Sequence, residues 1–137
     1  KNVGISRQFS IFELTRDLSL KNAPKALRTA AYIGSAAKFA MPMAVSALYS
    51  HFYKILKYGA LLMRNQNPPS DQKAKVLGVS PYFFKEYDAA VRNYPPKKAM
   101  AVIALLREYD FKGKGGNVGE ATPSELMVEL TAKILNI

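Results

Sequence analysis

The stretch PMAVSALYSHFYKILKYGALLMR, residues 42–64, decides the fold class of this 137-residue chain. Its apolar residues recur every three or four positions, the spacing that places side chains on one face of an α-helix: Val45, Leu48, Phe52, Ile55, Leu56 and Leu62. The run from Asn65 to Ser70, with two prolines, breaks the pattern. The segment therefore predicts one long helix with a single buried face.

The same helical spacing continues on both sides of this segment. It predicts further helices over residues 10–20, 24–38, 71–77, 81–93, 97–109 and 123–135. Phe12 is expected on the apolar side of the first helix and Phe83 on that of the fifth. Thr122, Pro123 and Glu125 form a capping-box signature before the last helix. No stretch alternates as a half-buried strand does, so the predicted fold class is all-α, an irregular bundle of six or seven helices.

Length and composition predict one helical domain spanning residues 1–137. Hydrophobic residues make up 49% of the chain and charged residues 22%, which is typical of globular domains. The chain begins with Lys1 and not with Met, so we expect a domain excised from a longer protein. No uncharged apolar run approaches the roughly 18 residues of a membrane span, so we expect no membrane partner.

Several kinds of catalytic site are excluded or disfavoured. The absence of cysteine excludes disulfides, thiolate chemistry and cysteine-based metal sites, and a single histidine, His51, excludes any site that needs two imidazoles. The glycine-rich run at 112–116 lacks the phosphate-binding P-loop pattern. Acidic residues are few and scattered. We therefore expect no catalytic residues, no metal and no cofactor, and a surface or half-buried position for His51.

The charge is strongly basic and uneven. Lys and Arg number 20 against 10 Asp and Glu, and no acidic residue occurs between Asp17 and Asp71. A surface of this sign attracts polyanions, with nucleic acid first and anionic membranes second. Basic residues recur along one face of the long helix, and others lie in the glycine-rich loop. The DNA-contact candidates are Lys54, Lys57, Arg64, Lys112 and Lys114.

Five segments, taken in order, resemble the C-terminal domain of the bacterial DNA polymerase III delta subunit. They are FSIFELTRDLSLKN at 9–22 with APKALR at 23–28, LYSHFYKIL at 48–56, LGVSPYF at 77–83, AVIALLREYDFK at 101–112 and SELMVELTAKIL at 124–135. The resemblance covers nearly the whole chain. It implies the helical collar module of the clamp loader, the machine that opens a sliding clamp and places it on primed DNA.

The resemblance also implies partners and a location. The collar would pack against the collar domains of the ATPase and delta-prime subunits, while the missing N-terminal part would contact the sliding clamp. The chain itself would not be an enzyme, although the parent complex is a DNA-directed DNA polymerase, a nucleotidyltransferase in the bacterial cytoplasm at the nucleoid. The isolated fragment could self-associate through the vacant surface. Because tyrosine is enriched at interfaces, the subunit-interface candidates are Tyr49, Tyr53, Tyr58 and Tyr94.

Two alternatives stay open at this stage. Tyrosine and phenylalanine interleave with lysine at 49–54 and 82–85, a composition that suits either base stacking or a core with an amphipathic rim. The chain could also be an independent helical nucleic-acid-binding protein. Its phosphate-backbone groove would then be formed by Lys21, Lys25, Arg28, Lys54, Lys57 and Arg64.

Overall fold

A computed structural model describes residues 3–113 and 121–137 of the chain, with side chains from residue 11 onward and up to 112 before the gap. Seven α-helices and no strand occur in these residues, which confirms the predicted all-α class. The helices are α1 (Val3–Ser19), α2 (Ala23–Gly34), α3 (Met41–Arg64), α4 (Ser70–Leu77), α5 (Phe84–Asn93), α6 (Pro96–Gly113) and α7 (Pro123–Leu135). A short 3-10 turn, η1 (Pro81–Phe83), precedes α5.

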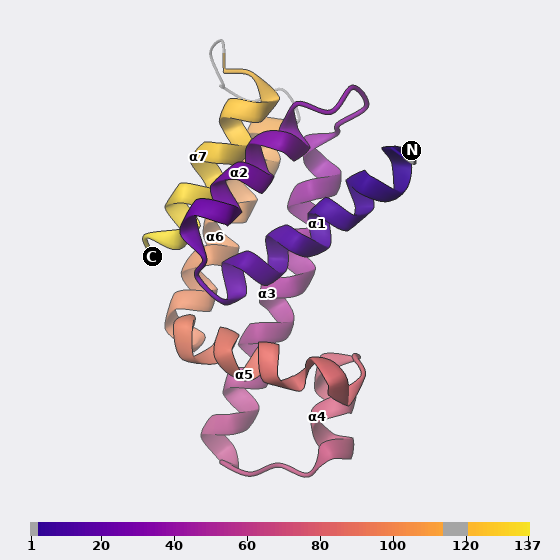
Figure 1. Cartoon of the computed structure of the whole chain (residues 1–137). Helices are drawn as coiled ribbons and strands as arrows, with labels where there is room; N and C mark the ends of the chain where they lie inside the picture. The colour runs from indigo at the N-terminus through magenta and orange to yellow at the C-terminus, as the bar shows by residue number, and fades with distance from the viewer. Residues whose placement is uncertain (1–2, 114–120) are drawn as a thin grey trace.

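The helices form two layers. Figure 1 shows α1, α2 and α7 in front, with α3 and α6 running in opposite directions behind them. The closest pairings are α3 with α6 and α2 with α7, while α1 contacts α2, α3 and α5. The short α4 and α5 lie at the lower end of α3. Tyr49, Tyr53 and Lys57 of α3 are exposed and lie on one side of the helix, which we call its open side.

The buried face of α3 forms the centre of the core. Leu48, Phe52 and Ile55 are fully buried, as their spacing predicts. The ring of Phe52 meets the ring of Tyr94 edge to face, with centroids 5.0 Å apart. Burial of such aromatic side chains stabilises the fold by a few kcal/mol each, so α3 is held firmly along its inner side.

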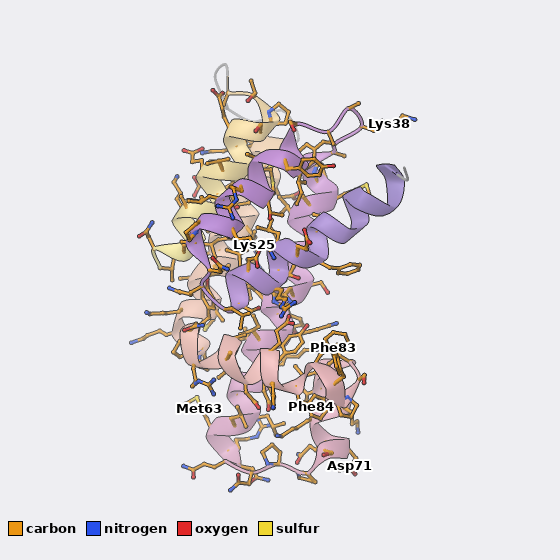
Figure 2. The ribbon with its side chains drawn as sticks, in the orientation of Figure 1. Lys25, Lys38, Met63, Asp71, Phe83 and Phe84 are labelled. Carbon is orange, nitrogen blue, oxygen red and sulfur yellow. The ribbon has the colours of Figure 1, made fainter. Side chains whose placement is uncertain are left out.

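Two predicted core positions are wrong. Phe12 is 67% exposed, because two residues along a helix differ by about 200°, and Leu14 takes the inward position instead. Phe83 is 44% exposed because it belongs to the 3-10 turn before α5, and its neighbour Phe84 turns inward (Figure 2). The core is therefore filled at these two places by Leu14 and Phe84, and Phe12 and Phe83 stay at the surface.

The end of α2 lies against the start of α7. We expected α2 to reach residue 38, but it ends at Gly34, where an added Cβ would lie 2.5 Å from the Ser124 Cα. The Ser124 hydroxyl donates to the Ala31 carbonyl oxygen at 3.1 Å. The capping box of α7 is confirmed, since the Thr122 hydroxyl accepts from the Glu125 amide at 3.1 Å and the Glu125 carboxylate accepts from the Thr122 amide at 2.8 Å.

Candidate nucleic-acid interface

The outer side of α3 carries a row of aromatic and basic side chains, Tyr49, Tyr53, Lys57 and Arg64, which we call the α3 stripe. Tyr49 and Tyr53 are 36% and 45% exposed. Their rings stack with an interplanar angle of 10° and centroids 6.1 Å apart, because residues four apart are neighbours on a helix surface. The Lys57 ammonium lies 4.9 Å from the centroid of the Tyr53 ring. Ring faces and positive charge therefore occur side by side.

The charge of the α3 stripe is not neutralised locally. α3 contains no Asp or Glu. Neither Lys57 nor Arg64 forms an ion pair with any residue that the structure describes. Lys54 differs from them, since it is half-buried and close enough to His51 for its charge to lower the pKa of that imidazole. The cations of this face that remain available to an external anion are thus Lys57 and Arg64.

Two of the four interface candidates are wrong. Tyr58 and Tyr94 are fully buried, and burial raises the pKa of both phenols. The Tyr58 hydroxyl donates to the Asp88 carboxylate at 2.5 Å. α5 packs against this side of α3 and covers it. The helical spacing already indicates a buried position for Tyr58, because it lies three residues after the buried Ile55.

A hollow of about 380 Å³ adjoins the upper end of the α3 stripe, between α3 and α6. It is lined by Pro42, Val45, Ser46, Tyr49, Leu106, Arg107 and Asp110. Arg107 adds a cation to the hollow that Tyr49 also lines, and sequence reasoning missed it. No local signal could have found it, because the hollow forms only where α6 packs against α3.

The remaining DNA-contact candidates lie elsewhere. Lys112 is in the last turn of α6, where it pairs with Glu108 at 3.4 Å and its ammonium lies 4.5 Å from the centroid of the Tyr109 ring. Lys114 and the glycine-rich segment 114–120 are outside the described residues. Lys112 therefore has partners within α6, and a role of either lysine in binding DNA stays a prediction.

A second basic and aromatic row lies on α2. We call Lys25, Arg28 and Tyr32 the α2 stripe; Figure 2 labels Lys25 on the front layer. These three residues and Glu13 line a hollow of about 290 Å³, and Lys25 pairs with the buried Asp17 at 3.8 Å. Five of the six cations of the predicted groove are thus divided between α2 and α3.

Lys21, the remaining member of that predicted groove, is also engaged within the fold. Its ammonium donates to the Leu135 carbonyl oxygen at 3.0 Å. Burial, together with the charge of Lys98, lowers the pKa of Lys21. Its position links the end of α1 to the end of α7.

His51 is buried, contrary to the prediction, because α1 and α5 both cover its side of α3. Its Nε2 lies 2.6 Å from the Ser19 hydroxyl and its Nδ1 lies 3.3 Å from the Tyr87 hydroxyl. Burial and the charge of Lys54 lower the pKa of His51 to about 3, so the ring is neutral at physiological pH. His51 therefore joins three helices through Ser19 of α1 and Tyr87 of α5, and the fully buried Ser19 presents no nucleophile at the surface.

Within the described part of the chain, no three metal-ligating side chains lie close enough to hold a metal ion. None of the helices in that part is long and apolar enough to cross a membrane. Comparison with known proteins finds no family model, curated protein or solved structure that matches the chain. The resemblance to the delta subunit therefore rests on its five sequence segments.

Proposed function

We propose that the chain is an assembly module of a bacterial clamp loader, corresponding to the C-terminal collar of the DNA polymerase III delta subunit. It would pack against the collar domains of the ATPase and delta-prime subunits, in the cytoplasm at the nucleoid, and would have no catalytic role of its own. The order of the five resembling segments along the chain supports this proposal. The all-helical fold is compatible with it.

The uncovered side of α6 is the observation that carries the assembly role. Met100 and Phe111 are 59% and 66% exposed, and Ala104 is exposed between them. Their spacing of four and seven residues places them on one side of α6, while its other sides pack against α3 and α7. Arg107, which is exposed and four residues before Phe111, lies on the same side, so two large apolar side chains flank one cation there. Such a side is suited to burial against a helix of a neighbouring subunit.

The secondary role is contact with DNA, for which the α3 stripe is the candidate surface. Its unpaired cations, Lys57 and Arg64, would be attracted to a phosphate backbone. In a clamp loader the collar lies beside the primer–template junction, so a basic surface on it would face primed DNA.

Co-elution on a sizing column with the collar domains of the same cell's ATPase and delta-prime subunits tests the assembly role. We expect a shifted common peak for the wild-type chain and for Phe12→Glu, a matched control with an equally exposed phenylalanine on α1. We expect Phe111→Glu and Met100→Glu to weaken the complex, because each places a charge in an apolar contact. Separate peaks for the wild-type chain would refute the assembly role.

The second candidate, an independent nucleic-acid-binding protein, is favoured by the stacked tyrosines beside Lys57. It predicts separate peaks in the same experiment together with tight DNA binding by the isolated chain. It also predicts that log affinity falls steadily with log salt, since each neutralised phosphate releases counterions.

A further inference from the structure

The tyrosine pair of the α3 stripe has the geometry of a stacking platform. Tyr49 and Tyr53 lie one helical turn apart on the open side of α3, and their rings are nearly parallel. The two rings stack on each other and the Lys57 ammonium lies over Tyr53, so the flat π-face left for a planar ligand is that of Tyr49, which lines the hollow between α3 and α6. Every nucleobase has such a face, so stacking on tyrosine tolerates any base sequence.

Cations lie at both ends of this platform. The Lys57 ammonium is next to Tyr53 at one end. Arg107 lines the hollow next to Tyr49 at the other end. One acidic residue, Asp110, also lines that hollow, whereas α3 has none. A free aromatic face on Tyr49 and a cation at each end of the tyrosine pair suit a strand in which bases and phosphates alternate.

We propose that the α3 stripe, together with Arg107 of α6, binds single-stranded DNA, with a base stacked on Tyr49 as an extension of the Tyr49–Tyr53 stack and phosphates held by Lys57 and Arg107. This inference rests on the DNA contact of the proposed function, to which it adds a location and a substrate class. Unpaired bases are required because the bases of a duplex are stacked on one another and their faces are covered. The same surface should therefore discriminate between single-stranded and double-stranded DNA.

A protein partner is the competing occupant, since tyrosine is also enriched at protein interfaces. The charges favour DNA. Lys57 has no acidic partner among the described residues, and its ammonium lies over the Tyr53 ring. An ammonium held over an aromatic face beside a second ring is the combination that strand-binding grooves use, in which stacking and backbone charge act together.

The test is fluorescence anisotropy of a labelled oligo-dT of about 12 nucleotides, and of a duplex of similar length, in the same low-salt buffer. We expect tighter binding of the single strand. The double variant Tyr49→Ala/Tyr53→Ala should lose roughly tenfold or more in affinity for oligo-dT, whereas Tyr49→Phe/Tyr53→Phe should stay within about twofold, because the rings remain. Tyr32→Ala, a matched control with an exposed tyrosine on α2, should also stay within about twofold.

A second variant keeps the test decisive if the double variant does not fold. Lys57→Ala removes one phosphate contact at an exposed position, so the slope of log affinity against log salt should fall by roughly 0.7. Circular dichroism of every variant checks that the helices persist. An unchanged slope in the folded Lys57→Ala variant would overturn the proposal.

The outcomes separate this inference from the assembly role. Unchanged oligo-dT affinity in folded Tyr49→Ala/Tyr53→Ala, or equal affinity for duplex, would overturn the inference. If that variant lost co-elution with the collar domains but kept its DNA affinity, the face would be a protein interface and the inference would be wrong. Tyrosine-dependent binding of oligo-dT without any co-elution would support the inference and refute the assembly role alone.

Discussion

The α3 stripe and the α2 stripe contain the same kinds of side chain in different surroundings. The α3 stripe presents two stacked tyrosines and a lysine on a helix without any acidic residue. The α2 stripe presents Tyr32, which is 55% exposed, beside Lys25 and Arg28. In the α2 stripe, however, Glu13 lines the same hollow and Asp17 lies 3.8 Å from Lys25.

The difference shows that composition alone does not locate a polyanion site. Burial raises the pKa of Asp17, while the charge of Lys25 acts in the opposite direction and favours the ionised carboxylate. Lys25 is therefore engaged by the fold, whereas Lys57 has no such partner among the described residues. A basic side chain attracts phosphate when its charge is not already compensated.

The two stripes are also held in place differently. The inner side of α3 packs into the centre of the core through Phe52 and Leu48. α2 is held at its end by the close approach of Gly34 to the backbone of Ser124 in α7. The following predictions test these differences, from the largest expected effect to the smallest.

The anchor of the α3 stripe should give the largest effect. Phe52→Ala should lower the free energy of unfolding by roughly 3–5 kcal/mol, because it leaves a cavity where a fully buried ring packs against Tyr94. Chemical denaturation measures this change. Tyr53→Ala, on the outer side of the same helix, should change the unfolding free energy by only about 0.5 kcal/mol. If Phe52→Ala changed the unfolding free energy only slightly, Phe52 would not be a core residue and the buried face of α3 would be a different one.

The stability of the fold should depend on pH through His51, which is buried on the inner side of α3. Its pKa is about 3 in the folded chain and about 6.5 when unfolded, so below pH 6.5 the unfolded chain takes up a proton that the folded chain does not. Stability should therefore fall as pH drops from 6.5, by up to about 1.4 kcal/mol per pH unit. His51→Gln should flatten this slope. NMR titration of the single histidine measures its pKa directly, and a midpoint near 6.5 in the folded chain would contradict the prediction.

The anchor of the α2 stripe should give a smaller loss. Gly34→Ala would place a methyl group 2.5 Å from the Ser124 Cα, so α2 and α7 must shift, at a cost of roughly 1–3 kcal/mol in unfolding free energy. Gly59→Ala is the matched control, since its Cβ would meet a side-chain atom, the Pro96 Cγ, at 3.1 Å and no backbone atom closer than that, and alanine favours the helix. Thermal unfolding of both variants compares them. Equal stability would show that α2 can move away from α7.

The smallest effect on the fold, and the sharpest contrast between the stripes, should come from charge reversal. Lys57→Glu should lower the affinity for oligo-dT and reduce its salt slope by at least roughly 0.7, because a phosphate contact is lost. Arg28→Glu on the α2 stripe should change both quantities less, since acidic residues already surround that position. Both variants should stay within about 0.5 kcal/mol of wild-type stability. An equal loss of affinity in the two variants would erase the distinction between the stripes.

Local pattern was sufficient for most of the secondary structure. The inner face of α3, the left-handed Gly78 that ends α4 and the capping box of α7 all depend on residues within a few positions of one another. The contact at the end of α2 could not be predicted in this way. It brings Gly34 against Ser124, which is 90 positions away in the sequence and adjoins Gly34 only in the folded chain.

The candidate site was predictable only in part. The sequence placed Tyr49, Tyr53 and Lys57 on one helix, and the structure confirms that they are neighbours on its open side. The same reasoning failed for Tyr58 and Tyr94, since an amphipathic side chain at the edge of a helix face is buried or exposed according to which helix packs beside it.

The sequence by itself determined that this protein is all-helical, basic and free of cysteine, and that its longest helix combines an apolar face with aromatic and basic flanks. These properties follow from composition and from a helical period that acts over a few residues. Only the tertiary structure decided which cations are paired within the fold, which tyrosines are exposed, and that Arg107 lines the same hollow as Tyr49. Such outcomes depend on the packing of helices distant in sequence, which short-range spacing does not encode.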